Sequence, residues 1–518
     1  MTNSSLALDV EDGVINVDGR ALPYDAPTTA ATPTTMIPSL KETGHSSSSW
    51  FSRRASGSTC DSGSTIIDSG SNPTAGKEAK LLDAGSKGDD LAVPQGGQHG
   101  MLEDQGLGLR LTHVDGVSTF KTIANLVCVV GGTGTLGMPR AVAQSGWLGT
   151  SAILLALFMS AFTGQILIES LYLKTTKRRP SYQDIARDTY GNMGHRFTYG
   201  IVAVNLFGCA VLYIILSATL IEAMVRDYTT ASEPIHFYVL GCSLFVWTCL
   251  IFTKTMKEVA LLSVLGSFAT FAVVCIAIGV SAEMALQLAA RAPVMHKLVD
   301  WTKLPLSFAT ISFAYGGNVV YPHIEQSMRY PRSWAKALWV ALSICCVMYF
   351  AIAIAGYAAF GDDAKSPILR NLPRGALSVM ANSFITLHVL LASPILLTSL
   401  AMMLEESILL RLPHFATGSI RFQFLKRAIP RTIIMFLVGL VSSVVPFFGD
   451  VMDLLGAMTT CLLVFVMPIM CYYRLGGLAN AGWGFRLWAV FILVVGLIAM
   501  VFGTYDAVKH LIDDFQRR

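Results

Sequence analysis

The chain has 518 residues, of which 53% are hydrophobic and 14% are charged, and its formal net charge is +4. Soluble domains carry about 25% charged residues, so this composition and the mean hydropathy of +0.55 exclude an ordinary soluble protein. The small net charge, without a basic stripe interleaved with aromatic residues, excludes nucleic acid as a partner. Most of the chain is therefore expected to lie in a lipid bilayer as an all-α membrane protein.

Residues 1–112 differ in composition from the rest of the chain. They are rich in Ser, Thr, Gly, Pro and Asp, and such a segment buries too little apolar surface to offset its ordering entropy. We predict a disordered tail over 1–112 and a membrane domain over 113–510. Within the tail, the sequence Arg53-Arg54-Ala55-Ser56 has the form of a kinase site directed by basic residues, which indicates Ser56 as its target.

Eleven apolar runs follow the tail, each long enough to cross about 30 Å of hydrocarbon. Lys and Arg are more frequent in the connections on one side, which places the N-terminus in the cytosol. Runs one to five and six to ten form two halves with opposite orientations, because each half has an odd number of crossings. The predicted spans are 118–139, 147–172, 197–225, 236–253, 258–287, 304–328, 335–359, 376–401, 430–448, 452–473 and 484–506.

The first and sixth runs are interrupted at corresponding places in the two halves. Glycines crowd the first run just before Pro139, and a second glycine pair lies just before Pro322. Helices interrupted in this way mark the binding site of a secondary transporter; the alternative for the glycines is close helix packing. The expected substrate-binding residues are Gly131, Gly132, Thr133, Gly134, Thr135, Tyr315, Gly316, Gly317 and Asn318.

Each break suits one end of a zwitterion. In the first, freed N–H groups and the positive end of the following half-helix attract a carboxylate. In the sixth, freed carbonyl groups attract an ammonium group or a cation. This polarity favours an amino acid over a sugar, and the walls of the pocket are expected from the third, eighth and tenth runs.

Ionisable residues within membrane helices are functional candidates by default. We expect Glu325, His323 and His388 to be the proton-coupling residues. The alternatives are an ion pair with Arg329 at the cytosolic interface for the first two, and a simple interhelical hydrogen bond for His388. Other ionisable residues in or near the runs are Glu169, Glu222, Asp450 and Asp453.

The sequence lacks the patterns of several other protein classes. No paired CxxC or Cys/His spacing occurs among the ten cysteines, so neither a metal site nor a disulfide framework is expected. No GxxxxGK[ST] motif and no nucleophile–base pattern is present, so we expect neither a nucleotide cofactor nor an enzyme.

The order of these segments resembles the amino acid/auxin permease family of the amino acid–polyamine–organocation superfamily. The resemblance covers about 115–505, and its strongest parts are Gly132-Thr-Gly-Thr-Leu-Gly-Met-Pro139 and Phe313-Ala-Tyr-Gly-Gly-Asn318. It implies a LeuT-like fold of 5+5 inverted repeats, with helices 1 and 6 discontinuous. Many members have histidine where this chain has Asn318, which cannot carry a proton. If protons drive the protein, Glu325, His323 or His388 is the expected carrier.

The resemblance implies coupled transport of amino acids, as in the vacuolar and vesicular transporters of eukaryotes. We therefore expect a secondary transporter of neutral amino acids that works by alternating access and is coupled to H⁺ rather than Na⁺. A vacuolar or lysosomal membrane is favoured over the plasma membrane. The alternatives are an amino acid sensor with little flux and a transporter of another zwitterion or an aromatic acid.

Overall fold

The computed structural model describes residues 16–17, 20–21, 116–228, 233–252, 260–289, 295–411, 420–479 and 481–517. The predicted tail, with Ser56, lies outside these ranges except for a small antiparallel pair, β1 (Asn16–Val17) and β2 (Arg20–Ala21). The chain divides into two units, Met1–Val93 and Pro94–Arg518. The disorder of the tail stays a prediction, and the following description concerns the second unit.

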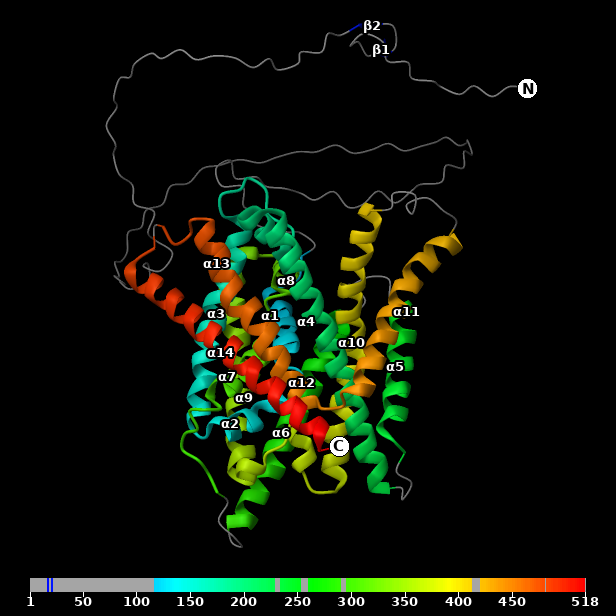
Figure 1. The fold of residues 1–518 in the computed structure, drawn as a ribbon, viewed down its shortest axis with the longest axis vertical. Helices are drawn as coiled ribbons and strands as arrows, with labels where there is room; N and C mark the ends of the chain where they lie inside the picture. The colour runs from blue at the N-terminus through cyan, green and yellow to red at the C-terminus, as the bar shows by residue number, and fades with distance from the viewer. Residues whose placement is uncertain are drawn as a thin grey trace, which may run out of the picture. The chain divides into compact units, whose positions relative to one another are not determined.

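Every predicted apolar run falls on one or more helices, as expected where lipid offers no partner for backbone groups. The α-helices are α1 (Thr119–Val130), α2 (Met138–Ser145), α3 (Leu148–Tyr172), α4 (Tyr182–Tyr228), α5 (Ile235–Phe252), α6 (Ala260–Ala289), α7 (Leu304–Ala314), α8 (Tyr321–Gln326), α9 (Trp334–Phe360), α10 (Ala376–Arg411), α11 (Ile420–Val444), α12 (Phe448–Leu455), α13 (Met467–Arg474) and α14 (Trp483–Gln516). Figure 1 shows them as one bundle. The short 3-10 helices are η1 (Thr133–Gly137), η3 (Pro331–Ser333), η4 (Gly361–Asp363) and η5 (Ile368–Asn371), and the π-helical segments are η7 (Gly456–Thr460) and η8 (Leu462–Val466).

Within the part of the chain that the structure describes, eight helices are long and apolar enough to cross a membrane. A ninth span results if α1 is joined to η1 and α2 across their bend of 42°. The fourth and sixth runs give shorter apolar helices, Ile235–Ile251 and Leu304–Ala314. The protein is thus a multi-pass helical membrane protein, and the number of eleven crossings stays a prediction.

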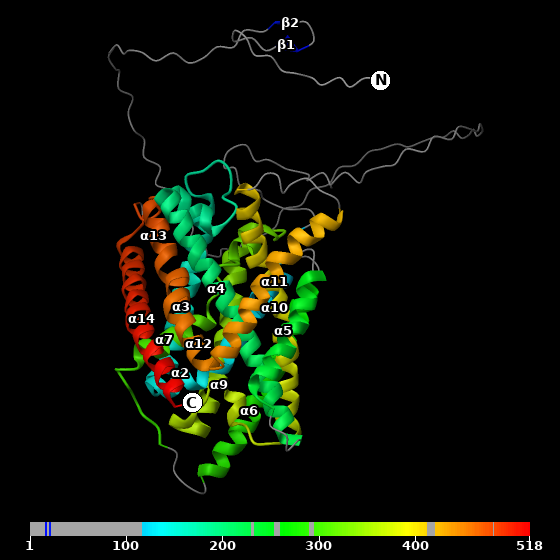
Figure 2. The same ribbon diagram turned by 45° about the vertical axis from the view of Figure 1, so that its right-hand side comes forward.

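The two predicted interruptions are present, and a proline begins the helix after each. Pro139 lies in the first turn of α2 and Pro322 in the first turn of α8, where the missing N–H leaves no helical hydrogen bond unmade. The helix before one break contacts the helix after the other: α1 contacts α8, and α2 packs on α7. Figure 1 places α8 toward the upper end of the bundle, and Figures 1 and 2 place α2 toward the lower end. The two interrupted spans therefore run antiparallel.

A short backbone bridge joins the beginning of the first span to the end of the sixth. Val117 donates its N–H to the Ser327 carbonyl at 2.8 Å and accepts the N–H of Arg329 at 2.8 Å, as in a parallel bridge between Val117 and Met328. The segment just before α1 is consequently fixed to the segment just after α8.

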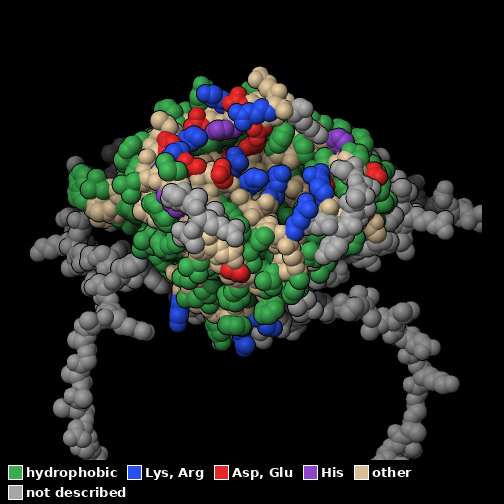
Figure 3. All heavy atoms as spheres, turned by 90° about the horizontal axis from the view of Figure 1, so that it is seen from below, with side chains coloured by type: hydrophobic (Ala, Val, Ile, Leu, Met, Phe, Trp, Pro, Cys, Tyr) green, Lys and Arg blue, Asp and Glu red, His purple; other side chains and the backbone are tan. Residues whose placement is uncertain are grey.

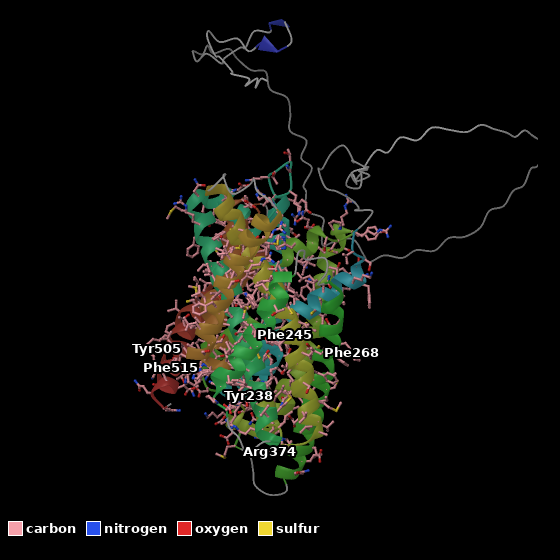
Figure 4. The ribbon with its side chains drawn as sticks, turned by 90° about the vertical axis from the view of Figure 1, so that its right-hand side faces the viewer. Tyr238, Phe245, Phe268, Arg374, Tyr505 and Phe515 are labelled. Atoms are coloured by element: carbon pink, nitrogen blue, oxygen red, sulfur yellow. The ribbon has the colours of Figure 1, made fainter. Side chains whose placement is uncertain are left out.

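Apolar side chains cover both the inside and the outside of the bundle. Phe245, Phe268 and Tyr505 project from its outer surface (Figure 4), and the last two are 74% and 67% exposed. Helices that are apolar all round are typical of a bundle surrounded by lipid. The inward-facing side chains form one continuous core that includes residues of both interrupted spans.

Close packing between α7 and the π-helical segment gives a testable requirement. A Cβ at Gly456 would overlap the carbonyl oxygen of Ala309, whereas a Cβ at Gly241 on α5 meets nothing within 4 Å. We expect Gly456→Leu to destabilise the protein by about 1–3 kcal/mol, the usual cost of overpacking. Thermal unfolding in detergent measures the change, with Gly241→Leu as the control. Equal unfolding temperatures for the two variants would contradict this packing.

Candidate substrate-binding site between the helix breaks

A cavity of about 70 Å³ lies between the two helix breaks. The breaks contribute Thr133 and Gly134 from η1 and Gly316 from the segment after α7. The remaining walls come from α1, α4, the end of α7, the segment leading to α8, α10 and η7. In the same order, their residues are Val129 and Val130; Asn205, Leu206, Cys209 and Tyr213; Phe313 and Ala314; Val319 and Val320; Leu396; and Thr460. The third, eighth and tenth runs thus supply walls, as expected from the sequence.

Only some of the residues predicted from the first break line this cavity. Thr133 and Gly134 do, whereas Gly131, Gly132 and Thr135 lie in the same break outside the lining. The Thr135 hydroxyl donates to the Gly131 carbonyl at 2.8 Å and thereby gives a partner to a backbone group of the break. The role of all five in substrate binding stays a prediction.

In the second break, Gly316 lines the cavity, while Gly317 packs against the Tyr321 ring. Tyr315 is fully buried, and its hydroxyl donates to the Ile153 carbonyl of α3 at 3.3 Å. The Asn318 amide donates to the Val464 carbonyl of η8 at 3.2 Å. Tyr315 and Asn318 therefore connect the second break to α3 and η8 by hydrogen bonds.

Tyr349 of α9 holds the two breaks together, and nothing in the sequence indicated this. Its buried hydroxyl lies 2.6 Å from the Val130 carbonyl oxygen, at the end of α1, and 2.9 Å from the Ala314 carbonyl oxygen, at the end of α7. A helix end leaves its last carbonyl groups without intrahelical partners. One hydroxyl proton is thus shared between the two interrupted helices.

Glycine also serves close packing at the breaks. A Cβ at Gly134 would overlap Ala314 of α7, and a Cβ at Gly316 would lie 2.8 Å from the Thr460 methyl carbon of η7. Such distances are too short for any larger residue. The packing alternative for the glycines therefore holds at these positions, although the same two glycines line the cavity.

The cavity lining is polar but uncharged. Thr133, Asn205, Tyr213 and Thr460 contribute its polar side chains. Asn205, on α4, donates to the Thr459 hydroxyl at 2.8 Å and so joins α4 to the π-helical segment. Segments of π-helix frequently accompany functional sites. None of the lining residues, all of which lie in the described ranges, is Asp, Glu, Lys, Arg or His.

The three proton-coupling candidates lie apart from the cavity lining. Glu325, on α8, is 1% exposed and accepts hydrogen bonds from Arg178 at 2.8 Å and from the Tyr172 hydroxyl at 2.6 Å. Its ion-pair partner is thus Arg178, and the alternative of a pair with Arg329 is wrong. The partner comes from the connection after α3, which the folded bundle brings beside α8.

The two histidines have different surroundings. His323 lies on α8 with its side chain exposed. His388 is buried on α10, where its imidazole packs directly against Gly266 of α6. A role in proton transfer stays a prediction for both residues and for Glu325.

A second polar cluster lies at the α2 end of the bundle. Arg140 of α2 pairs with Asp450 of α12 at 3.2 Å. One turn further along each helix, the Gln144 amide of α2 donates to the Asp453 carboxylate of α12 at 3.1 Å. The Thr310 hydroxyl of α7 donates to the same carboxylate. The sequence identified both aspartates only as ionisable residues near a helix end.

The loop before α7 covers this α2 end, since the Asp300 N–H donates to the Ser145 carbonyl at 3.0 Å. Its charged groups interact at the surface. The hydrogen bond to Asp362, at 3.0 Å, raises the pKa of Lys297, and the hydrogen bond from Thr302 lowers the pKa of Asp300. Figure 3 shows charged and histidine side chains gathered on this lower face.

Removal of the Tyr349 hydroxyl tests its position between the breaks. We expect Tyr349→Phe to lower the free energy of unfolding by about 1–3 kcal/mol, because two buried carbonyl groups lose a donor. Thermal unfolding of the purified protein measures this loss. Tyr505→Phe, on the exposed face of α14, is the control and is expected to unfold like the wild type. A stability unchanged in Tyr349→Phe would contradict the proposed constraint.

The chain is similar in sequence to known membrane proteins. A family model described as transmembrane amino acid transporter protein matches residues 115–509. Similar relatives are the amino acid transporter AVT1C of Arabidopsis thaliana, 27% identical over 76% of this chain and 70% of the relative, and the vesicular inhibitory amino acid transporter of Xenopus tropicalis, 25% identical over 76% and 77%.

Among solved structures, a nucleobase-cation-symport-1 family transporter in a closed conformation is 12% identical, with a TM-score of 0.48 over 79% of this chain and 96% of that chain. The family match spans most of the chain and confirms the resemblance to the amino acid/auxin permeases. The protein is therefore not an enzyme but a member of the transmembrane amino acid transporter family.

Proposed function

We propose that the protein is a secondary active transporter that moves neutral amino acids by alternating access and is coupled to protons. The observation that supports this proposal is the uncharged cavity between two interrupted, antiparallel helices. Secondary transporters with inverted repeats bind their substrates where such helices cross. The complete repeat of five helices per half is part of this proposal.

The chemistry of the cavity supports a zwitterion as the substrate. In this proposal the carboxylate lies against Thr133 and Gly134, the two residues of the first break that line the cavity. The ammonium group lies toward the backbone carbonyls near Phe313 and Gly316. A ligand with a net charge would find no counter-ion among the lining residues, and an uncompensated buried charge is costly. Neutral amino acids therefore fit best.

The size of the cavity favours small substrates. A cavity needs about 10–15 Å³ to hold one water molecule, so a cavity of about 70 Å³ holds roughly five to seven water molecules. An amino acid of the size of glycine or alanine has a similar number of non-hydrogen atoms. We infer that small neutral amino acids are bound in this conformation.

Polar clusters close the bundle on both sides of the cavity. Arg178 and Glu325 pair near α8, and Arg140 and Asp450 pair near α2. In the proposed cycle, one pair separates while the other stays closed, so the cavity opens to one side at a time. Because each ion pair is largely buried, its separation requires water to enter the opened side and hydrate the two charges.

The proposed location is the vacuolar or lysosomal membrane, with the N-terminus in the cytosol. The name of the vesicular relative supports an intracellular membrane. In the predicted orientation, α1 begins on the cytosolic side, so the α2 end faces the lumen.

Obstruction of the first break tests the site. A Cβ at Gly132 would lie 3.6 Å from the Cys128 carbonyl oxygen and 3.8 Å from the Tyr213 hydroxyl, which is ordinary contact. A leucine there fits beside the backbone but extends toward Tyr213 in the cavity. We expect Gly132→Leu to fold and to bind amino acids at least about tenfold more weakly. Binding to purified protein measures the loss, Gly132→Ala is the control, and wild-type affinity in the leucine variant would exclude the site.

Transport by the purified full chain in proteoliposomes tests the function. With an imposed pH gradient, we expect labelled alanine or another small neutral amino acid to accumulate, and a protonophore to abolish the accumulation. Empty liposomes are the control. Binding without flux would favour the sensor alternative, and a strict requirement for sodium would contradict proton coupling.

A further inference from the structure

Asp453 is a buried carboxylate at a junction of three helices. It lies on α12 and is 1% exposed. Its two oxygens accept hydrogen bonds from Gln144 of α2, at 3.1 Å, and from Thr310 of α7. One donor thus belongs to the half-helix after the first break, and the other to the half-helix before the second. The carboxylate connects both moving parts of the proposed transporter to α12.

The cluster contains more buried negative than positive charge. Arg140, which is 28% exposed, pairs with Asp450 at 3.2 Å, and both hydrogen bonds to Asp453 come from neutral side chains. The other ionisable groups that face the two aspartates are His510 and Asp514 of α14. Among the described residues, Arg140 thus supplies the guanidinium for both buried carboxylates, and His510 is the other basic group that faces them. A buried charge without its own counter-ion is costly, and protonation removes that cost.

Gln144 has a side chain suited to both forms of Asp453. Its Nε2 donates to the carboxylate, while its Oε1 is buried and has no hydrogen-bond partner among the residues described. Rotation of the amide by half a turn would exchange the two atoms. The amide oxygen could then accept a hydrogen bond from a protonated carboxyl group. The same three helices can thus hold either form, with different hydrogen bonds.

We propose that Asp453 binds the coupling proton and that its protonation changes the contact of α2 and α7 with α12. This inference rests on the proposed function. The proton comes from the aqueous phase at the α2 end, where charged side chains gather on the surface (Figure 3). It binds a carboxylate oxygen of Asp453, no other covalent bond changes, and the proton leaves when the half-helices move to the opposite state. In the ionised form, Thr310 and Gln144 both donate to the carboxylate. In the neutral form, the carboxyl group donates to the Gln144 amide oxygen, and the hydrogen bond from Thr310 loses the assistance of the negative charge.

The experiment uses the full chain in proteoliposomes, with two readouts. The first is exchange of labelled for unlabelled alanine without a gradient, and the second is accumulation driven by a pH gradient. We expect Asp453→Asn, which fixes a neutral group of the same shape, to keep exchange within about twofold of the wild type. Accumulation is expected to fall at least about tenfold, and the dependence of exchange on pH to disappear.

The matched control is Asp363→Asn, which neutralises an exposed carboxylate in η4 and is expected to leave both readouts unchanged. If Asp453→Asn accumulates alanine and responds to pH like the wild type, the inference is overturned while the proposed function stands. If the wild type neither exchanges nor accumulates any amino acid, the proposed function itself fails.

If Asp453→Asn does not fold, a second variant tests whether Asp453 binds the proton. Thr310→Val removes one hydrogen bond that favours the ionised carboxyl group, with little change in volume. We expect the pH at which exchange is half-maximal to move upward in this variant, while the pH dependence itself persists. An unchanged midpoint in folded, active Thr310→Val protein would overturn the assignment of the proton to Asp453.

Discussion

The need to satisfy backbone carbonyl groups in an apolar interior governs this structure, and one hydroxyl group meets that need at both breaks. A carbonyl without a partner in such surroundings costs several kcal/mol. Tyr349 lies within 2.9 Å of the carbonyl oxygens that end α1 and α7. With those ends fixed, Gly134 can pack against Ala314, and the remaining space between the breaks is the cavity. The site is thus a product of how the helix ends are satisfied.

Charge is distributed so that the centre stays neutral and the ends do not. The lining residues of the cavity carry no charge, whereas Glu325 with Arg178 and Asp450 with Arg140 lie on either side of it. A neutral centre imposes no electrostatic barrier on a zwitterion, while paired charges near water can separate and be hydrated. The uneven pairing at the α2 end distinguishes the two sides. One side is an ion pair with a hydroxyl donor, and the other has a carboxylate in excess.

Much of the architecture could be predicted because glycine, proline and long apolar runs have strong local consequences. The helical runs and both interruptions follow from such local signals. The contacts of Tyr349 and Asn205 could not be predicted, because they join helices whose apolar surfaces look alike on every side. For the same reason, sequence proximity favoured Arg329 as the partner of Glu325, while the fold supplies Arg178. Asn318 was expected in the site; its amide donates to η8, a contact that the sequence did not indicate, and its role in substrate binding stays a prediction.

The parallel bridge between Val117 and Met328 has a mechanical consequence. Two backbone hydrogen bonds of 2.8 Å tie the residue that precedes the first interrupted span to the residues that follow the second. Backbone groups make this tie, and it leaves no room for a side chain beside it, since a Cβ at Gly116 would lie 2.5 Å from the Arg329 Cα atom. Tension applied through the preceding segment of the chain would therefore act on both interrupted spans at once.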